Sequence, residues 1–250
     1  MRTNPPAAMP RLTGVSPWIV ALLTAVLALS GCSGGGDTKD SAADTSKLQA
    51  RLDAAKKTID DAESITISLS TPHVPTGVSG LLSAKGQGNH TPAFKGKVTV
   101  VTGGTSLGAD VIAVGGDVLA KTSFSPVYLS IDPASLKAPD PAALFDKTTG
   151  ITQILTKTDK LTDGGKSRDG SDVLTTIKGT LPSSVVQTII PSADGGSVFQ
   201  VTYRLDDDDV LRDATLSGPF YETGGDVTYT VKLTASDTPV TIEAPTRPGA

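Results

Sequence analysis

Hydrophobic and polar residues alternate with a period of two over most of the chain from Ser64 onward. Gly, Asn, Asp and Pro residues interrupt the alternation at short intervals, which is typical of antiparallel strands joined by turns. The first six predicted strands are expected to form a meander, and Asp169-Gly170 is expected to be a tight turn. The predicted strands lie near residues 65–70, 78–88, 94–102, 109–114, 117–123, 127–131, 164–180, 197–205, 210–217, 226–234 and 239–243.

Helical spacing replaces the alternation in a few places. After the cap candidates Asp44, Thr45 and Ser46, one apolar face predicts an amphipathic helix, with Leu48, Leu52, Ala55, Ile59 and Ala62 at its helical positions. In the middle of the chain, Asp140 and Pro141 make a favourable helix start, and two short helices are predicted over 142–145 and 151–158, around Gly150. Residues 182–190 predict one more helix, which Pro191 stops.

The N-terminus has the three parts of a bacterial lipoprotein signal. Arg2 and Arg11 are a positive n-region, residues 18–29 are an apolar h-region, and Leu29-Ser30-Gly31-Cys32 follows directly. The apolar run is shorter than the about 20 residues of a membrane span, so a short transmembrane anchor with an incidental cysteine is the less favoured alternative. We expect cleavage after Gly31 and acyl chains on Cys32, since stable anchoring takes two chains.

These features divide the chain into four parts. Residues 1–31 are expected to be the signal peptide and 32–45 a small, polar, flexible tether that carries the lipidated Cys32. Residues 46–245 are expected to form one folded domain, followed by a frayed tail over 246–250. The expected location is the cell membrane, lipid-anchored on its extracytoplasmic face.

The composition argues against several classes of function. Cleavage takes away Arg2 and Arg11 but no acid, so the mature chain has 20 basic and 26 acidic side chains and nothing suggests nucleic-acid binding. Cys32 is the one cysteine of the sequence, which leaves none for a disulfide or a thiolate metal site once it is lipidated. Stability must therefore come from packing.

Two candidate motifs lack the context that their chemistry needs. Gly104-Thr105-Ser106-Leu107-Gly108 matches the G-x-S-x-G pattern of serine hydrolases, but a nucleophile elbow requires a following helix and a later histidine. A strand is predicted after Ser106, and His73 and His90 both precede it. We interpret the motif as a hairpin loop and the histidines as surface residues, and we expect no enzymatic activity.

The acidic run Asp206-Asp207-Asp208-Asp209 lacks the alternating ligand spacing and the glycine of a calcium loop. Four adjacent acids between two predicted strands indicate a solvated hairpin tip. Gly115-Gly116 is not followed by a predicted helix, so it does not indicate a phosphate-binding loop. We expect no metal and no cofactor.

What remains is a set of aliphatic positions on one face of the predicted strands. Alternation reports burial, and an ordinary core filled by side chains is the alternative to a cavity filled by a ligand. The inward set is Ile65, Ile67, Leu69, Val98, Val100, Ile112, Val114, Val127, Leu129 and Ile131.

The order of these features resembles the LppX/LprA/LprF/LprG lipoprotein family of mycobacteria and relatives. The strongest match is Ala138-Pro139-Asp140-Pro141-Ala142-Ala143-Leu144-Phe145-Asp146 leading into Thr149-Gly150-Ile151-Thr152-Gln153-Ile154-Leu155. The likeness continues through Gly170-Ser171-Asp172-Val173 to the final hairpins, so it covers essentially the mature chain. The resemblance implies an α+β fold, a curved antiparallel half-barrel with helices across its concave face enclosing an apolar cavity, broadly similar to LolA-like carriers.

The resemblance also implies a function. Members bind triacylated glycolipids or triacylglycerol, often beside a major-facilitator transporter, and carry them across the cell envelope. The implied cavity residues are Ile67, Leu69, Val98, Val100, Ile112, Val114, Val127, Leu129, Leu144, Ile151, Ile154 and Leu155. The alternative is a non-transporting envelope lipoprotein that stabilises or regulates a membrane partner.

Overall fold

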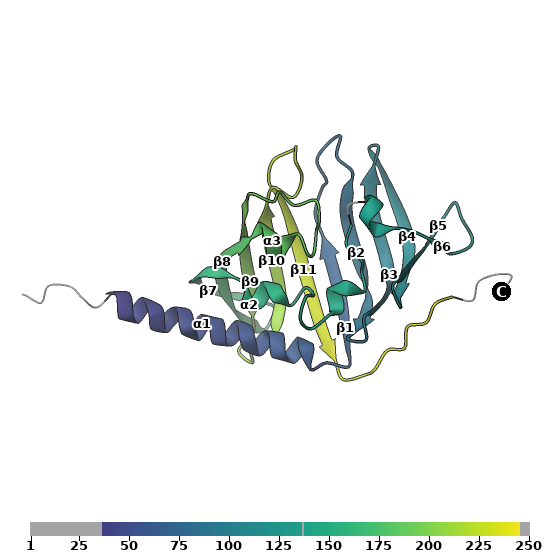
Figure 1. The fold of residues 1–250 in the computed structure, drawn as a ribbon. Helices are drawn as coiled ribbons and strands as arrows, with labels where there is room; N and C mark the ends of the chain where they lie inside the picture. Colours follow the sequence, from purple (N-terminus) through teal and green to yellow (C-terminus); the bar gives the residue numbers. More distant parts are fainter. Residues whose placement is uncertain (1–36, 137, 246–250) are drawn as a thin grey trace, which may run out of the picture. The chain divides into compact units, whose positions relative to one another are not determined.

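The computed structural model describes residues 37–136 and 138–245, and Figure 1 shows that they form one large sheet with helices on one of its faces. The sheet is antiparallel and has eleven strands. They are β1 (Ser64–Ser70), β2 (Gly80–Asn89), β3 (Ala93–Thr102), β4 (Thr105–Val114), β5 (Asp117–Thr122), β6 (Leu129–Ser130), β7 (Asp159–Asp169), β8 (Asp172–Pro182), β9 (Val198–Leu205), β10 (Leu211–Gly218) and β11 (Val227–Ser236).

The strand order is β6-β5-β4-β3-β2-β1-β11-β10-β9-β8-β7. Strands that follow one another in the sequence are neighbours, except that β6 and β7 are the two edge strands. This order confirms the meander predicted for the first six strands, and β1 joins the two halves by pairing with both β2 and β11. The predicted fold, a curved antiparallel half-barrel with helices across its concave face, is confirmed. The chain passes from one half to the other through residues 131–158, here called the crossing segment.

One long helix and several short helical elements cover the concave face. The long helix α1 (Asp37–Asp60) lies along it, and the crossing segment contributes two 3-10 turns, η1 (Pro133–Leu136) and η2 (Ala143–Phe145), and helix α2 (Gln153–Thr156). Helix α3 (Ser183–Val186) follows β8. Among the helices that the structure describes, none combines the length and the apolar character needed to cross a membrane.

The two ends of the described chain differ from the prediction. Helix α1 begins at Asp37, inside the predicted tether over 32–45, because neither glycine nor proline stands between Asp37 and Asp60 to stop it. Residues 239–243 pair with no described strand, since Pro239 lacks an N–H, although Val240 accepts a hydrogen bond from Asn89 at 2.9 Å. The signal at 1–31, Cys32 and the tail at 246–250 lie outside the described residues.

Two hydrophobic clusters lie on opposite faces of the sheet. The main cluster joins Leu52, Ala55 and Ile59 of α1 to the concave face and the crossing segment. The second cluster, on the convex face, packs Ala93 and Ile112 against Ile242 of the C-terminal segment. One predicted amphipathic face of α1 is therefore confirmed as a core face.

The concave side chains are large in one half of the sheet and small in the other. Cross-strand partners share a face, so the row through Leu69 can be followed in both directions. Toward β7 it passes Val231, Ala214, Tyr203 and Ile177. Toward β6 it passes Ala84, Val98 and Ala109. In the next row Gly86 faces Gly96, so the β2–β4 half leaves room above its surface.

Candidate functional site

An apolar pocket lies between the small-residue half of the concave face and the crossing segment. Its volume is about 60 Å³, and every side chain that lines it is apolar. The sheet contributes Ile67, Leu69, Leu81, Ala84, Phe94 and Val98; the crossing segment contributes Ala138, Pro139, Pro141, Leu144 and Ile151, and Ile189 completes the wall. Pockets for drug-sized ligands measure roughly 300–1,000 Å³. The closed pocket is therefore too small for an acyl chain.

Two aromatic rings reduce the space above the sheet. Phe94 of β3 and Phe145 of η2 are stacked with their ring centroids 6.1 Å apart. A Cβ added to Gly86 or Gly96 would lie 2.6 Å from the Phe94 ring, and one on Gly88 would lie 2.6 Å from the Phe145 ring. The rings thus rest directly on glycines of β2 and β3, where any side chain would displace them.

The crossing segment turns sharply after η2. The Asp146 carboxylate accepts hydrogen bonds from the N–H of Thr148 at 2.8 Å and of Thr149 at 2.7 Å, and from the Thr149 hydroxyl at 2.9 Å. These donors stabilise the charged carboxylate and lower the pKa of Asp146 to about 2. Gly150 is required here, because a Cβ would collide with the carbonyl oxygens of Asp146 and Leu144.

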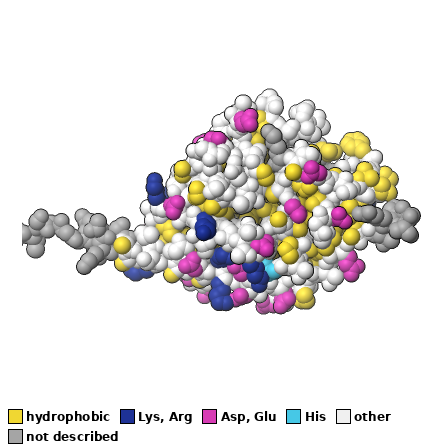
Figure 2. All heavy atoms as spheres, viewed as in Figure 1, with side chains coloured by type: hydrophobic (Ala, Val, Ile, Leu, Met, Phe, Trp, Pro, Cys, Tyr) yellow, Lys and Arg dark blue, Asp and Glu magenta, His cyan; other side chains and the backbone are white. Residues whose placement is uncertain are grey.

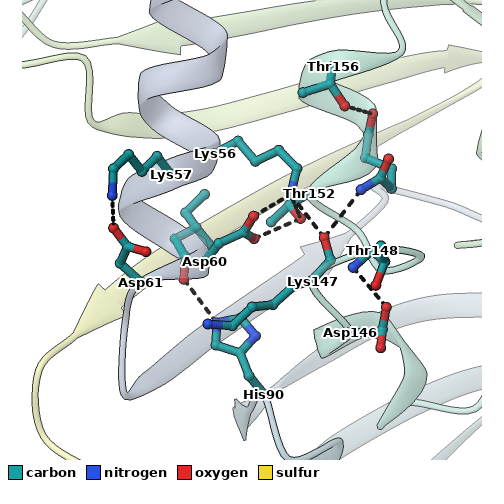
Figure 3. A network of polar contacts seen from close by, with 12 residues as sticks. Lys56, Lys57, Asp60, Asp61, His90, Asp146, Lys147, Thr148, Thr152 and Thr156 are labelled. Carbon is teal, nitrogen blue, oxygen red and sulfur yellow. Dashed lines mark hydrogen bonds and ion pairs between the residues drawn. The ribbon is translucent and has the colours of Figure 1, made fainter.

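Helix α1 holds the same turn through polar contacts (Figure 3). Lys56 is paired with Asp60, and its ammonium donates to the Lys147 carbonyl at 3.0 Å and to the Thr152 hydroxyl at 3.2 Å. The Thr152 hydroxyl donates to Asp60 at 3.1 Å. Water can replace contacts of this kind, so they need not prevent the turn from moving.

His90, at the end of β2, lies between α1 and η2 (Figure 3). Its Nδ1 is 2.8 Å from the Phe145 carbonyl oxygen, and its Nε2 is 3.1 Å from that of Ile59. The sequence-based interpretation of His90 as a surface residue is wrong, because the ring is half-buried between two carbonyls. His73 is exposed, as predicted.

The other end of the crossing segment is fixed more firmly. Ile154 and Leu155 of α2 are fully buried, and the Tyr203 hydroxyl of β9 donates to the Ile154 carbonyl at 2.7 Å. Burial raises the pKa of Tyr203, so the hydroxyl stays protonated and remains a donor. This end of the segment thus combines full burial of its apolar side chains with a buried hydrogen bond from the sheet.

An open, more polar hollow adjoins the apolar pocket, and Ala138 lines both. It has a volume of about 710 Å³ and lies between the loops at one end of the sheet, with Gln187, Asp194 and Glu222 among its lining residues. A hydrogen bond from the Ser197 hydroxyl lowers the pKa of Asp194, so this carboxyl stays charged. The hollow, here called the mouth, thus lies beside the apolar pocket and has two carboxylates in its wall.

Five of the predicted cavity residues line the apolar pocket, namely Ile67, Leu69, Val98, Leu144 and Ile151. Val100 lies on the same face of β3, opposite Leu81, but outside the pocket. Ile154 and Leu155 belong to the packed core of α2.

The remaining predicted positions need correction. Ile112 and Val114 lie on the convex face with Ala93 and Ile242, because β4 is apolar on both faces and alternation could not tell them apart. Val127 and Leu129 are 40% and 53% exposed at the edge of the sheet. Neither pair lines the apolar pocket. Cys32 and Gly31 lie outside the described residues.

Sequence reasoning missed Phe94, Phe145 and the glycines beneath them. The available signal was a strand with glycine at alternate positions, Gly86 and Gly88, which marks a place where another group approaches the backbone closely.

The two candidate chemical motifs are turns. Gly103 and Gly104 join β3 to β4, and Ser106 pairs with Val101 inside the hairpin, so a strand and not a helix follows it. The acidic run forms the β9–β10 turn, as predicted, where Arg51 of α1 pairs with Asp209 and donates to the Asp206 carbonyl at 2.7 Å.

Comparison with known proteins gives four findings. The family model of the LppX_LprAFG lipoproteins matches residues 45–243. The crystal structure of LprF from Mycobacterium bovis matches with 18% identity over 80% of this chain and 97% of that chain, at a TM-score of 0.63. Lipoprotein LppX of Mycobacterium tuberculosis matches with 18% identity over 79% of this chain and 99% of that chain, at a TM-score of 0.56. No curated protein sequence matches.

Proposed function

Since the chain belongs to the LppX_LprAFG lipoprotein family, we propose that it is a lipid-anchored carrier that takes acylated lipids into its half-barrel and moves them across the cell envelope. The observation that carries this proposal is the wholly apolar pocket, roofed by a segment that polar contacts hold in place. An apolar surface covered by a movable roof is what a carrier of acyl chains needs.

The energetics explain why a carrier is useful. A chain of about 15 methylenes costs on the order of 12 kcal/mol to expose to water. A lipid with two or three such chains therefore leaves a bilayer too rarely to cross an aqueous layer at a useful rate. An apolar pocket removes this cost without any covalent chemistry. A carrier therefore needs no nucleophile, and Ser106 stands in a β-hairpin rather than in a nucleophile elbow.

Loading requires the pocket to grow. At about 60 Å³ it holds only a small part of an acyl chain, so the segment from η1 to the Asp146 turn must lift from β2 and β3. The concave face beneath it is lined by the small residues Ala84, Gly86, Gly96 and Ala109. The Phe94 ring covers Gly86 and Gly96, so an acyl chain takes this space once the stacked Phe94 and Phe145 rings move. The polar groups of the lifted segment then form hydrogen bonds with water in place of their contacts with α1.

The hollow beside the pocket favours an uncharged headgroup. Asp194 and Glu222 would repel a phosphate, whereas carboxylates accept hydrogen bonds from hydroxyl groups. Triacylated glycolipids agree with this mouth because their sugar hydroxyls can donate to the carboxylates, and triacylglycerol agrees with it because it carries no charge.

Mass spectrometry of lipid that co-purifies with the protein tests the proposal. We expect acylated, uncharged lipid at a fixed ratio to the chain, and less of it after Leu144→Asp, which places a carboxylate in the pocket wall. Val210→Asp, in the β9–β10 turn, is the matched control and should leave the ratio unchanged. Protein free of lipid in the wild type would instead support the non-transporting alternative, which the small closed pocket favours.

A further inference from the structure

Three large apolar side chains are exposed on the connection from β5 to β6 and at the first residue of β6. Phe124 is 86% exposed, Leu129 53% and Val127 40%. We call these three residues the β5–β6 patch. Figure 2 shows hydrophobic side chains gathered at the right of the view, where Figure 1 places β5 and β6. Exposed apolar residues that lie together mark a surface that another apolar surface covers.

The connection that carries the patch is ordered and uncharged. The Ser125 N–H donates to the Thr122 carbonyl at 3.2 Å, and the Ser125 hydroxyl donates to the Val127 carbonyl at 3.0 Å. From residue 122 to residue 131 the sequence has no Asp, Glu, Lys, Arg or His, and Tyr128 stands between two residues of the patch. Aromatic, aliphatic and hydroxyl side chains without charge are the composition that a bilayer interface accepts.

The patch lies at the end of the sheet where the polar hollow opens. Strand register places the β5–β6 connection, the start of β2 at Gly80 and the β10–β11 turn after Gly218 at one end. The hollow is lined at this same end by Ser79 and Glu222. The chain that follows the patch reaches the pocket further on, because Ala138 and Pro139, after η1, form part of the pocket wall.

We propose that the β5–β6 patch inserts into the bilayer surface and brings the mouth of the half-barrel against it during lipid exchange. This inference rests on the proposed function. A bilayer is favoured over a protein because the chain belongs to a lipoprotein family, the patch is uncharged, and it lies at the end of the sheet where the hollow beside the apolar pocket opens. Insertion lets chains pass between bilayer and pocket with little exposure to water.

A single-tryptophan experiment tests insertion directly. In a Trp18→Phe background, which leaves no other tryptophan in the sequence, the full chain with Phe124→Trp is reconstituted in phosphatidylcholine vesicles that have brominated acyl chains. We expect a blue shift of its emission and stronger quenching than for Val210→Trp, whose residue lies at the opposite end of the sheet. Equal quenching at the two positions would overturn the proposal.

A second arm separates insertion from lipid binding. The double variant Phe124→Asp/Val127→Asp removes exposed side chains only, so it should melt at the wild-type temperature and keep the wild-type ratio of bound lipid. Transfer of that lipid to phosphatidylcholine acceptor vesicles should fall at least about tenfold. The reason is that the free energy gained by burying one Phe side chain exceeds the free energy that corresponds to a tenfold change in binding. Wild-type transfer by the double variant would overturn the proposal.

Two further outcomes are distinguishable. If the double variant loses cellular function while the Phe124→Trp protein shows no quenching, the patch belongs to a protein partner and the proposal is overturned. A wild-type protein without lipid would refute the proposed function, while the quenching result still stands by itself.

Discussion

The ring of Phe145 in η2 rests on Gly88 of β2, so close that a Cβ on Gly88 would lie 2.6 Å from two of its ring atoms. Phe145 is 2% exposed, and it comes from the crossing segment that roofs the apolar pocket. Under the proposed function, this side chain occupies space on the concave face that a lipid chain would take. We call it the plug.

We predict that the Phe145→Ala variant binds more lipid per chain than the wild type and is less stable. Removal of a buried Phe side chain costs about 3–5 kcal/mol of the free energy of unfolding. The same removal enlarges the pocket and lowers the free-energy cost of opening it for a lipid chain. Denaturant unfolding of the delipidated protein and the bound lipid per chain are the two measurements.

Phe220→Ala is the control for this prediction. Phe220 is also fully buried, but it packs against Phe199 and Tyr229 in the large-residue half, with ring centroids 4.9 and 4.8 Å away. It should lose similar stability without gaining lipid. If both variants gained lipid equally, loosening of the fold and not the plug would be the cause.

The prediction of the fold from the sequence succeeded because alternation, turn residues and helical spacing are local. The meander of the first six strands followed from their short connections, and the helix face with Leu52 and Ile59 from periodicity alone. The pairing of β1 with β11 joins distant segments, so local patterns did not predict it. The start of α1 was missed because a polar stretch without glycine fits either a tether or an exposed helix. Pairing of residues 239–243 was overpredicted because a Pro in an alternating segment does not reveal whether a partner strand exists.

The site was predicted less well for a physical reason. Alternation marks two faces but does not say which one is concave, and in β4 both faces are apolar, so Val111 and Ala113 point inward and Ile112 and Val114 outward. The volume above a strand depends on neighbours brought by register, such as Gly86 opposite Gly96. Only the folded sheet shows that its small residues come together.

Asp146 gives a pH dependence with a defined sign. Its folded pKa of about 2 lies below the about 3.9 of an unfolded Asp. The stabilisation is therefore fully present above about pH 4 and is lost as the pH falls toward 2. Melting temperatures between pH 2 and pH 5 should fall less steeply for Asp146→Asn than for the wild type. The difference should be modest because the carboxylate is partly exposed, and parallel curves for the two proteins would contradict it.

Lipidation of Cys32 is predicted from the Leu29-Ser30-Gly31-Cys32 box. Cys32→Ala should leave an unprocessed precursor or release the domain from the membrane, because no other cysteine can carry a thioether-linked lipid. Intact mass and membrane fractionation are the measurements. A mature form of unchanged mass that stays on the membrane in the variant would contradict lipidation.

Val98→Trp distinguishes a loadable pocket from a packed core. Val98 is half-buried on β3 and lines the apolar pocket beneath a roof that polar contacts hold, so an indole can enter by lifting that roof. Val201 is the matched control, since it is a valine on the concave face of β9 with 2% exposure and fixed neighbours in Gly179 and Leu216.

Forcing extra volume into a well-packed site costs about 1–3 kcal/mol or more. We therefore expect Val201→Trp to lower the free energy of unfolding by this amount or more and Val98→Trp to stay near the wild type, when both are measured without lipid. With lipid present, Val98→Trp should fail to load because the indole occupies the space of a chain. Equal destabilisation of the two variants would show that position 98 belongs to an ordinary core, and a stable Val98→Trp protein that loads normally would place the acyl chains elsewhere.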